Sequence, residues 1–185
     1  MPRYVALLRA INVGKRIVKM DKLRALFEDA GFKNVETLIA SGNVIFDSSS
    51  KNTDAIEKKI ERALETGLGY PVETFVRTAA ELAAVTGGTP FKGSKQHAPT
   101  NNLYIGFLKA PPPDEMTAKL VAIQTPNDEF RVVGREYYWS CRTSLGQSAE
   151  TAKQLGKVLK LDNTVRNITT VRKLAELSAK GQRLS

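Results

Sequence analysis

The sequence predicts an α+β fold built as a tandem repeat of two ferredoxin-like (βαββαβ) subdomains, with an added helix after each. Strand-like and helix-like segments follow in the same order in both halves of the 185-residue chain. In addition, residues 4–10 (YVALLRA) match residues 104–110 (YIGFLKA) position for position. We therefore expect a first subdomain over residues 1–90, a linker over residues 91–99 and a second subdomain over residues 100–185.

The first half is predicted to begin with a strand over residues 4–9. Asp21 is placed to cap a helix whose apolar residues recur at i, i+3, i+4 and i+7 and which Gly31 ends. Residues 35–40 and 44–47 form a hairpin that turns at residues 41–43 (SGN). A helix over residues 54–64, a strand over residues 72–77 and an alanine-rich helix to Val85 complete this half.

The second half is predicted to repeat this order with shorter connections. After the strand at residues 104–110, we expect a helix over residues 114–123, strands over residues 129–133 and 136–140, and a helix over residues 150–160. Gly42 is matched with Gly134, and residues 76–78 (VRT) with residues 165–167 (VRN). Three prolines, residues 111–113, replace Ile11-Asn12-Val13, so the two copies differ in the loop that leaves their first strand.

Five segments, in this order and spacing, resemble a bacterial family known as the domain of unknown function 1697. They are residues 8–14 (LRAINVG), 41–46 (SGNVIF), 76–78 (VRT), 134–138 (GREYY) and 164–167 (TVRN). The resemblance implies a duplicated ferredoxin-like α+β fold and brings no activity with it. The chain departs from the family pattern at Lys15, where the family has Gly, at Ala149, where it has Lys, and at Ile168-Thr169, where it has Trp-Asn.

An anion-binding site at the exit of the first strand is the main functional hypothesis. In an antiparallel βαββ arrangement, this exit and the hairpin turn lie at the same sheet edge, and loops on a rigid scaffold often carry binding residues. Arg9 offers a bidentate contact to phosphate, Gly14 lets the backbone approach a ligand, and Lys15 adds positive potential beside a helix N-terminus. The candidate ligand-binding residues are Arg9, Asn12, Gly14, Lys15, Ser41 and Asn43. A purely conformational role stays open, because Gly and Asn tolerate positive φ.

Two alternatives remain beside it. Residues 103–108 (LYIGFL) resemble the first strand of an RNA-recognition domain, so Tyr104, Tyr137 and Trp139 are candidates for stacking single-stranded nucleic acid. The second signature of such domains is missing from residues 134–137 (GREY), which weakens this alternative. The other alternative is an enzyme with a site between the two halves, where the secondary candidates are Arg77, Arg135, Arg166 and Asn167.

Other kinds of site find little support in the sequence. No P-loop and no G-x-G-x-x-G occurs. His97 is the only histidine, and we interpret it as a surface residue, so we expect no metal and no cofactor. The single cysteine, Cys141, is interpreted as a packed thiol. The expected partner is a small anionic ligand or, less strongly, nucleic acid.

The overall composition is that of a globular protein with a basic excess. The net charge is +9, spread along the chain without a Lys/Arg tract. No apolar run approaches the about 20 residues that span a bilayer, and no signal-like segment precedes the first strand. We therefore expect a cytoplasmic protein without a membrane partner. The sequence does not indicate an oligomeric state.

Overall fold

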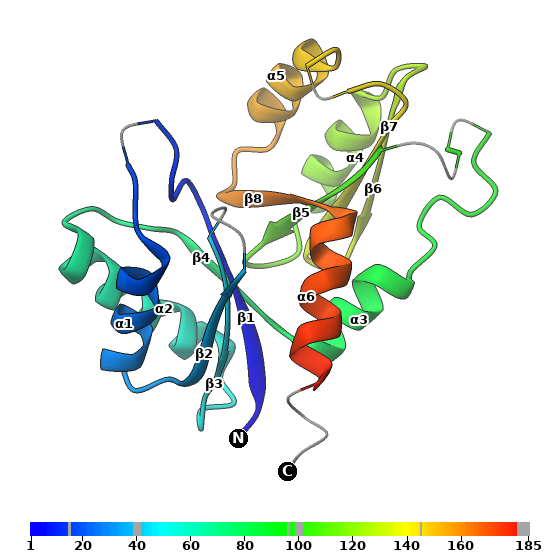
Figure 1. Ribbon diagram of the computed structural model, residues 1–185. Helices are drawn as coiled ribbons and strands as arrows, with labels where there is room; N and C mark the ends of the chain where they lie inside the picture. Colours follow the sequence, from blue (N-terminus) through cyan, green and yellow to red (C-terminus); the bar gives the residue numbers. More distant parts are fainter. Residues whose placement is uncertain (15, 39–41, 96, 99–101, 145, 181–185) are drawn as a thin grey trace. The chain divides into compact units, whose positions relative to one another are not determined.

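The structure is a computed structural model that describes residues 1–14, 16–38, 42–95, 97–98, 102–144 and 146–180. The chain divides into two compact units. The first consists of Met1–Thr86 and the C-terminal stretch from Arg172, and the second of Gly87–Val171. Each contains one four-stranded antiparallel sheet, so the predicted α+β class is confirmed (Figure 1).

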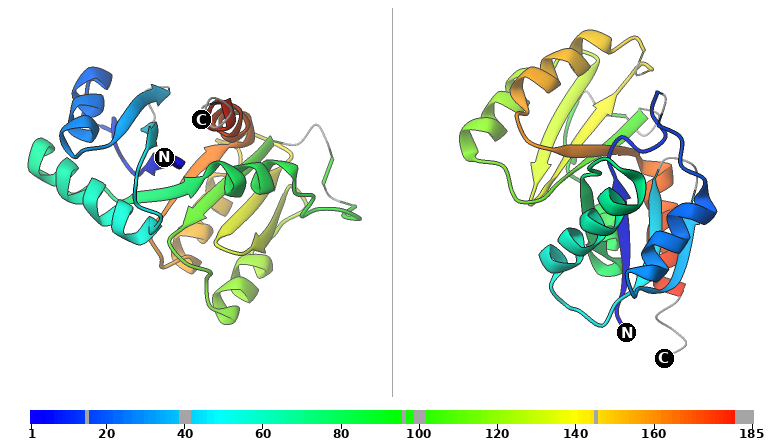
Figure 2. Two further views of the ribbon diagram at one scale, coloured as in Figure 1. Left: turned by 90° about the horizontal axis from the view of Figure 1, so that it is seen from below. Right: turned by 90° about the vertical axis from the view of Figure 1, so that its left-hand side faces the viewer.

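The sheet of the first unit has the strand order β2-β3-β1-β4. Its strands are β1 (Arg3–Leu8), β2 (Lys33–Leu38), β3 (Asn43–Asp47) and β4 (Thr74–Thr78), and its helices include α1 (Met20–Asp29), α2 (Thr53–Leu68) and α3 (Ala79–Gly87). The helices α1 and α2 lie side by side on one face of this sheet (Figure 2). This is the split βαβ arrangement that the sequence predicts.

Alternation along the strands builds the core of the first unit. Every second residue of β1, from Tyr4 to Leu8, packs with Phe46 of β3 against the apolar faces of α1 and α2. Phe27 of α1 lies 5.5 Å from Phe46, centroid to centroid, in an edge-to-face contact. The alternate residues of β1, Val5 and Leu7, point to the opposite face and are also fully buried, so both faces of β1 are covered.

Two glutamates of α2 protect the outer edge of β4. An edge strand presents backbone N–H groups without a neighbouring strand. Glu57, which is 3% exposed, accepts a hydrogen bond from the N–H of Val76 at 2.8 Å, and Glu61 accepts one from the N–H of Thr74 at 3.1 Å. The carboxylates therefore take the place of a fifth strand.

The predicted cap of α1 is wrong. Lys19 is the N-cap residue and makes no side-chain capping bond, while Asp21 lies inside the first turn and pairs with Arg24. The next helix, α2, has a side-chain cap: Asn52 accepts a hydrogen bond from the N–H of Ala55 at 3.0 Å. With Asn52 as its N-cap, α2 begins at Thr53, one residue earlier than predicted.

The sheet of the second unit has the corresponding order, β6-β7-β5-β8. Its strands are β5 (Asn102–Leu108), β6 (Asp128–Val133), β7 (Glu136–Cys141) and β8 (Asn163–Asn167), its helices are α4 (Asp114–Ala122) and α5 (Ala149–Val158), and α6 (Ile168–Lys180) follows β8. The two helices α4 and α5 pack on one face of this sheet, around Phe130, Tyr137 and Trp139.

Strand register shows how far the two units correspond. Val5 pairs with Arg77, as Ile105 pairs with Arg166, so the predicted match of these two arginines is confirmed. The match of Gly42 with Gly134 is wrong by one residue. Leu8 donates a backbone hydrogen bond to the carbonyl of Gly42, and the equivalent Leu108 donates to that of Arg135. The topology is shared; descent of both units from one ancestral copy stays a prediction.

Part of the predicted linker packs on the second sheet. The hydroxyl of Ser94 donates to Glu129 at 2.5 Å, and His97 Nδ1 lies 2.7 Å from the hydroxyl oxygen of Ser140. The ring of His97 also stacks on Phe91, with centroids 4.7 Å apart. The interpretation of His97 as a loose surface residue is therefore wrong, because these contacts fix its ring against the sheet.

Candidate functional site

The loop after β1 has an unusual backbone. Ala10, Asn12 and Gly14 have φ values of 53°, 57° and 63°, whereas the intervening Ile11 and Val13 do not have positive φ. Left-handed backbone is uncommon for residues other than glycine, and Ala lacks the polar side chain that eases it for Asn. The sign of φ thus alternates over five residues, the pattern in which successive N–H groups form an anion-binding nest.

The N–H groups of this loop are largely available. Arg9 N–H donates to the carbonyl of Glu73 at 2.9 Å, which fixes the start of the loop to the connection before β4. No described residue accepts a hydrogen bond from the N–H of Ala10, Ile11, Val13 or Gly14. Since backbone donors rarely stay unpaired, these four groups require solvent or a ligand as acceptor.

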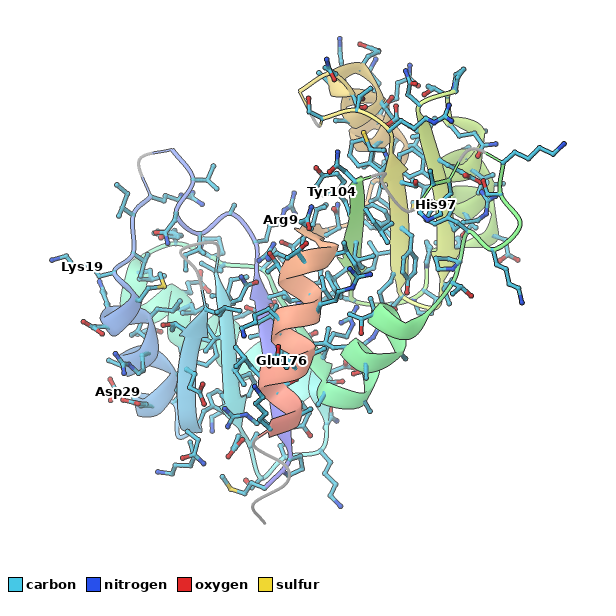
Figure 3. All side chains as sticks on the ribbon, turned by 45° about the vertical axis from the view of Figure 1, so that its right-hand side comes forward. Arg9, Lys19, Asp29, His97, Tyr104 and Glu176 are labelled. Atoms are coloured by element: carbon cyan, nitrogen blue, oxygen red, sulfur yellow. The ribbon has the colours of Figure 1, made fainter. Side chains whose placement is uncertain are left out.

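Two arginines flank the nest. Arg9, directly after β1, is exposed, and Figure 3 labels it together with Lys19 and Asp29 at the two ends of α1. Arg16 is also exposed, and its guanidinium carbon lies 4.4 Å from the ring centroid of Tyr70. This contact holds the guanidinium over Tyr70, in the connection between α2 and β4. Lys15, a predicted ligand residue, lies outside the described residues.

The structure brings the hairpin turn and this loop together, as the sequence predicts. Leu8 N–H donates to the carbonyl of Gly42 at 2.8 Å. A Cβ on Gly42, whose φ is 76°, would lie 2.3 Å from the Cγ2 of Ile11, so only glycine allows this approach. Ser41 lies outside the described residues. The hairpin therefore supports the loop through the buried side chain of Ile11.

The two asparagines predicted to orient a ligand have structural contacts. Asn43 is fully buried, and its amide nitrogen donates to the carbonyl of Leu38 at 3.2 Å, which closes the hairpin. A contact of Asn43 with a ligand is therefore excluded by its burial. The Oδ1 of Asn12 accepts a hydrogen bond from the N–H of Val18 at 2.5 Å and closes the loop. The contribution of Asn12 is thus to hold the nest in shape.

The secondary candidates lie in and beside the sheets. Arg77 is fully buried and donates to the carbonyl of Val76 at 2.9 Å. Arg166 donates to the hydroxyl of Thr164 at 2.7 Å, and burial lowers the pKa of its guanidinium to about 10. Arg135 is half-buried in the turn between β6 and β7.

Asn167, the last secondary candidate, ends β8. Its Oδ1 accepts a hydrogen bond from the N–H of Thr169 at 2.8 Å, in the first turn of α6. An Asn side chain at this position satisfies an N–H group that the helix itself leaves unpaired. Asn167 therefore starts this helix, which is a structural role.

The aromatic platform proposed for nucleic acid is not open. Tyr137 is fully buried and Trp139 is 3% exposed, both in the core beneath α4 and α5. The Tyr137 hydroxyl donates to Asn163 at 3.0 Å, and only Tyr104 of the three rings is partly exposed. In RNA-recognition domains the stacking rings lie on the face away from the helices. The base-stacking hypothesis is therefore wrong for these strands.

A buried polar network surrounds the single tryptophan and the single cysteine. Asp128, 3% exposed, accepts hydrogen bonds at Oδ1 from Trp139 Nε1 (2.8 Å) and the Ser148 hydroxyl (2.9 Å), and at Oδ2 from the Thr151 hydroxyl (2.8 Å). Burial acts to raise the pKa of this carboxyl, but these hydrogen bonds outweigh it and keep the pKa below the ordinary value. The network fixes the start of α5 to the sheet.

Cys141 belongs to the same network. Its thiol lies 3.1 Å from the Ser148 hydroxyl and donates to the carbonyl of Thr143 at 3.0 Å. The thiol is fully buried, in agreement with a packed residue. Among the described residues, no cluster of three His, Cys, Asp or Glu side chains is arranged to hold a metal ion.

The sequence pattern pointed to the loop but missed several of its features. The positive φ of Ala10, the anchoring carbonyl of Glu73 and the contact between Arg16 and Tyr70 have no sequence signal, because alanine, glutamate and tyrosine give no local indication of these roles.

In the described part of the chain, no helix combines the length and apolar character needed to cross a membrane.

Comparison with known proteins gives a family and a fold. No curated protein matches the chain. A solved structure, that of the conserved bacterial protein SP0830 from Streptococcus pneumoniae, is similar with a TM-score of 0.76 and 23% sequence identity, over 97% of this chain and 99% of that one. This similarity supports the two-unit fold. The family model described as a protein of unknown function (DUF1697) matches residues 1–138, and the chain therefore belongs to this family.

Proposed function

We propose that the loop over residues 9–16 binds a small anionic, phosphate-bearing ligand. The observation that carries this proposal is the alternation of positive φ at Ala10, Asn12 and Gly14, in a loop whose N–H groups at residues 10, 11, 13 and 14 have no described acceptor. Successive N–H groups in such a backbone favour an oxyanion.

The charges around the loop favour phosphate over a neutral ligand. Arg9 and Arg16 are exposed and flank the nest, and the first turn of α1 begins at Met20, close in sequence. A helix N-terminus carries partial positive charge, and guanidinium groups bind phosphate oxygens in pairs. An anion bound here would therefore accept backbone hydrogen bonds and charge-assisted ones together.

The second unit provides an internal comparison. Its equivalent strand also ends at a leucine, Leu108, but residues 111–113 after it are all proline. Proline has no N–H, so this connection contributes three fewer backbone donors. The fold therefore does not require a donor-rich loop at this position, which supports a ligand-binding role for residues 9–16.

Thermal unfolding with added anions tests the proposal. Ligand at a hundredfold excess over its Kd stabilises the folded protein by about 2.7 kcal/mol, a rise of several degrees in melting temperature. The anions are inorganic phosphate, pyrophosphate and glucose 6-phosphate, compared with sodium chloride at equal ionic strength. We expect at least one of them to raise the melting temperature of the parent protein.

Matched variants show whether the rise comes from this loop. Arg9→Ala and Arg16→Ala are expected to reduce it strongly. Arg62→Ala, an exposed arginine on α2 of the same unit, is expected to leave it unchanged. An equal loss with Arg62→Ala would mean that general charge, and not the loop, attracts the anion.

A further inference from the structure

A cavity of about 320 Å³ lies at the opposite end of the first sheet from this loop. The loop over residues 9–16 follows the end of β1 where Leu7 pairs with Asn43, whereas the cavity lies where Arg3 pairs with Asp47. The residues after β3, the start of β2 and the first turn of α2 form its walls. We propose that this cavity binds a small organic anion with an apolar body, independently of the function proposed above.

The cavity combines cations and hydroxyls. Lys33 and Lys59 line it together with Ser48, Ser49 and Ser50, and no carboxylate of a described residue does. Its walls also include Ala55, in the first turn of a 16-residue helix, whose positive end favours an anion. A carboxylate or phosphate group here would meet two ammonium groups and hydroxyl donors.

The nearest strand carboxylate does not cancel this charge. Asp47 precedes Ser48, but its Oδ1 accepts a hydrogen bond from the guanidinium of Arg3 at 3.2 Å, and its Oδ2 accepts one from the Asn34 amide at 2.6 Å. Both oxygens are thus occupied outside the cavity walls. Arg3 also pairs with Glu36, so its guanidinium binds both carboxylates.

The apolar part of the cavity comes from the core. Phe32 and Ile56 are 3% and 1% exposed and form the part of the walls continuous with the core around α1 and α2. The Nζ of Lys59 lies 5.2 Å from the ring centroid of Phe32, so the charged and apolar surfaces adjoin. The volume is near the lower end of ligand pockets, about 300–1,000 Å³, which suits a metabolite-sized molecule.

A cavity of similar size in the second unit lacks these properties. It measures about 310 Å³ and is lined by Lys119, Lys157 and Lys160, but also by Glu115. Lys119 donates to this carboxylate at 2.5 Å and lowers its pKa, so Glu115 stays ionised and pairs with one of the three ammonium groups. No hydroxyl side chain of a described residue lines this cavity beside the other two. The inference is therefore confined to the cavity beside Phe32.

Titration calorimetry with simple probes tests the inference. Octanoate and phenyl phosphate represent the two possible head groups on apolar bodies, and octan-1-ol and phenol are their neutral counterparts. We expect at least one anion to bind and its neutral counterpart to bind about tenfold more weakly or worse. Lys59→Ala is expected to weaken binding of that anion about tenfold, since a charge-assisted contact is lost.

The neighbouring Lys58 supplies the matched control. It is exposed on the same helix but does not line the cavity, so Lys58→Ala should leave the affinity unchanged. Ala55→Phe places a ring in the cavity from an exposed helix position and should abolish binding without loss of fold. Both alanine variants keep a strong helix former on α2.

Several results would overturn the inference. These are no binding of either anion, equal affinity for the neutral counterparts, unchanged affinity in Lys59→Ala and Ala55→Phe, or equal weakening by Lys58→Ala. Arg9→Ala separates this site from the loop over residues 9–16. Anion binding that is lost in Arg9→Ala and kept in Lys59→Ala belongs to the loop and contradicts the cavity site.

Discussion

Replacement of Asp128 by asparagine is expected to destabilise the second unit by about 1–3 kcal/mol. The carboxylate accepts hydrogen bonds from Trp139 and Ser148 at one oxygen, and from Thr151 and Thr125 at the other. Asparagine keeps one neutral acceptor oxygen and puts an NH2 donor where the other oxygen was, so two hydrogen bonds are weakened and the other two lose their acceptor. Hydrogen bonds to a charged group contribute about 1.5–3 kcal/mol each and those to a neutral one about 0.5–1.5 kcal/mol, so the loss amounts to several kcal/mol. Relief from burying a charge offsets part of this.

Urea unfolding followed by tryptophan fluorescence measures this change, because Trp139 is the only tryptophan and donates to Asp128. Asp114→Asn, at an exposed position in the first turn of α4, is the control and should change the unfolding free energy by less than about 0.5 kcal/mol. Equal unfolding free energies for Asp128→Asn and this control would refute the reasoning.

The difference in unfolding free energy between the parent protein and Asp128→Asn should depend on pH. The folded pKa of Asp128 lies below its ordinary value of 3.8. The stabilisation from its ionised form is therefore complete above about pH 3.8 and is lost as the pH falls through the folded pKa. The difference between the parent and Asp128→Asn should be constant near neutral pH and shrink on acidification below pH 3.8.

Two predictions concern glycines. Gly106→Ala should lower the melting temperature by several degrees, since its Cβ would lie 2.0 Å from the ring of Tyr137. Gly156→Ala in α5 should raise the melting temperature slightly, because no atom lies within 4 Å of the new Cβ. The opposite order of melting temperatures in calorimetry would contradict the assigned packing. Gly42→Ala should cost about 1–3 kcal/mol in urea unfolding, because φ is 76° and Ile11 occupies the space, and an unchanged midpoint would argue against this contact.

The order of elements could be predicted from the sequence because it depends on local patterns. Strand alternation and the apolar spacing in α1 and α2 indicate the βαββαβ order directly. The cap of α1 could not, because Asp21 and Lys19 both precede the first buried residue and only the backbone shows where the helix begins. The match of Gly42 with Gly134 is off by one residue for a similar reason: a glycine marks a turn in the sequence but does not show which backbone groups pair across the two strands.

Sequence reasoning also could not decide which face of a sheet is covered. Tyr137 and Trp139 alternate as a stacking platform requires, but alternation is equally typical of a buried face. Helices α4 and α5 cover the face that carries Tyr137 and Trp139, and which face they cover depends on long-range packing. For the same reason Asn43 was predicted at an accessible edge and lies in the core.

The candidate loop was located from the sequence, but its chemistry was not. Arg9 and Gly14 marked the position, whereas the left-handed Ala10 and the N–H groups without described acceptors are visible only in the backbone. A non-glycine residue with positive φ has no reliable sequence signature. The structure therefore changes the hypothesis from side-chain recognition by asparagines to backbone recognition supported by arginines.

The most direct test of anion binding by the loop is a backbone ¹H–¹⁵N NMR titration with inorganic pyrophosphate at constant ionic strength. The account predicts saturable downfield shifts of the amide protons of Ile11, Val13 and Gly14, since these groups would donate to the phosphate oxygens. Small shifts are expected at Lys58 and Arg62 on the exposed side of α2. Unchanged loop amides at saturating pyrophosphate, or shifts confined to other residues, would contradict the account.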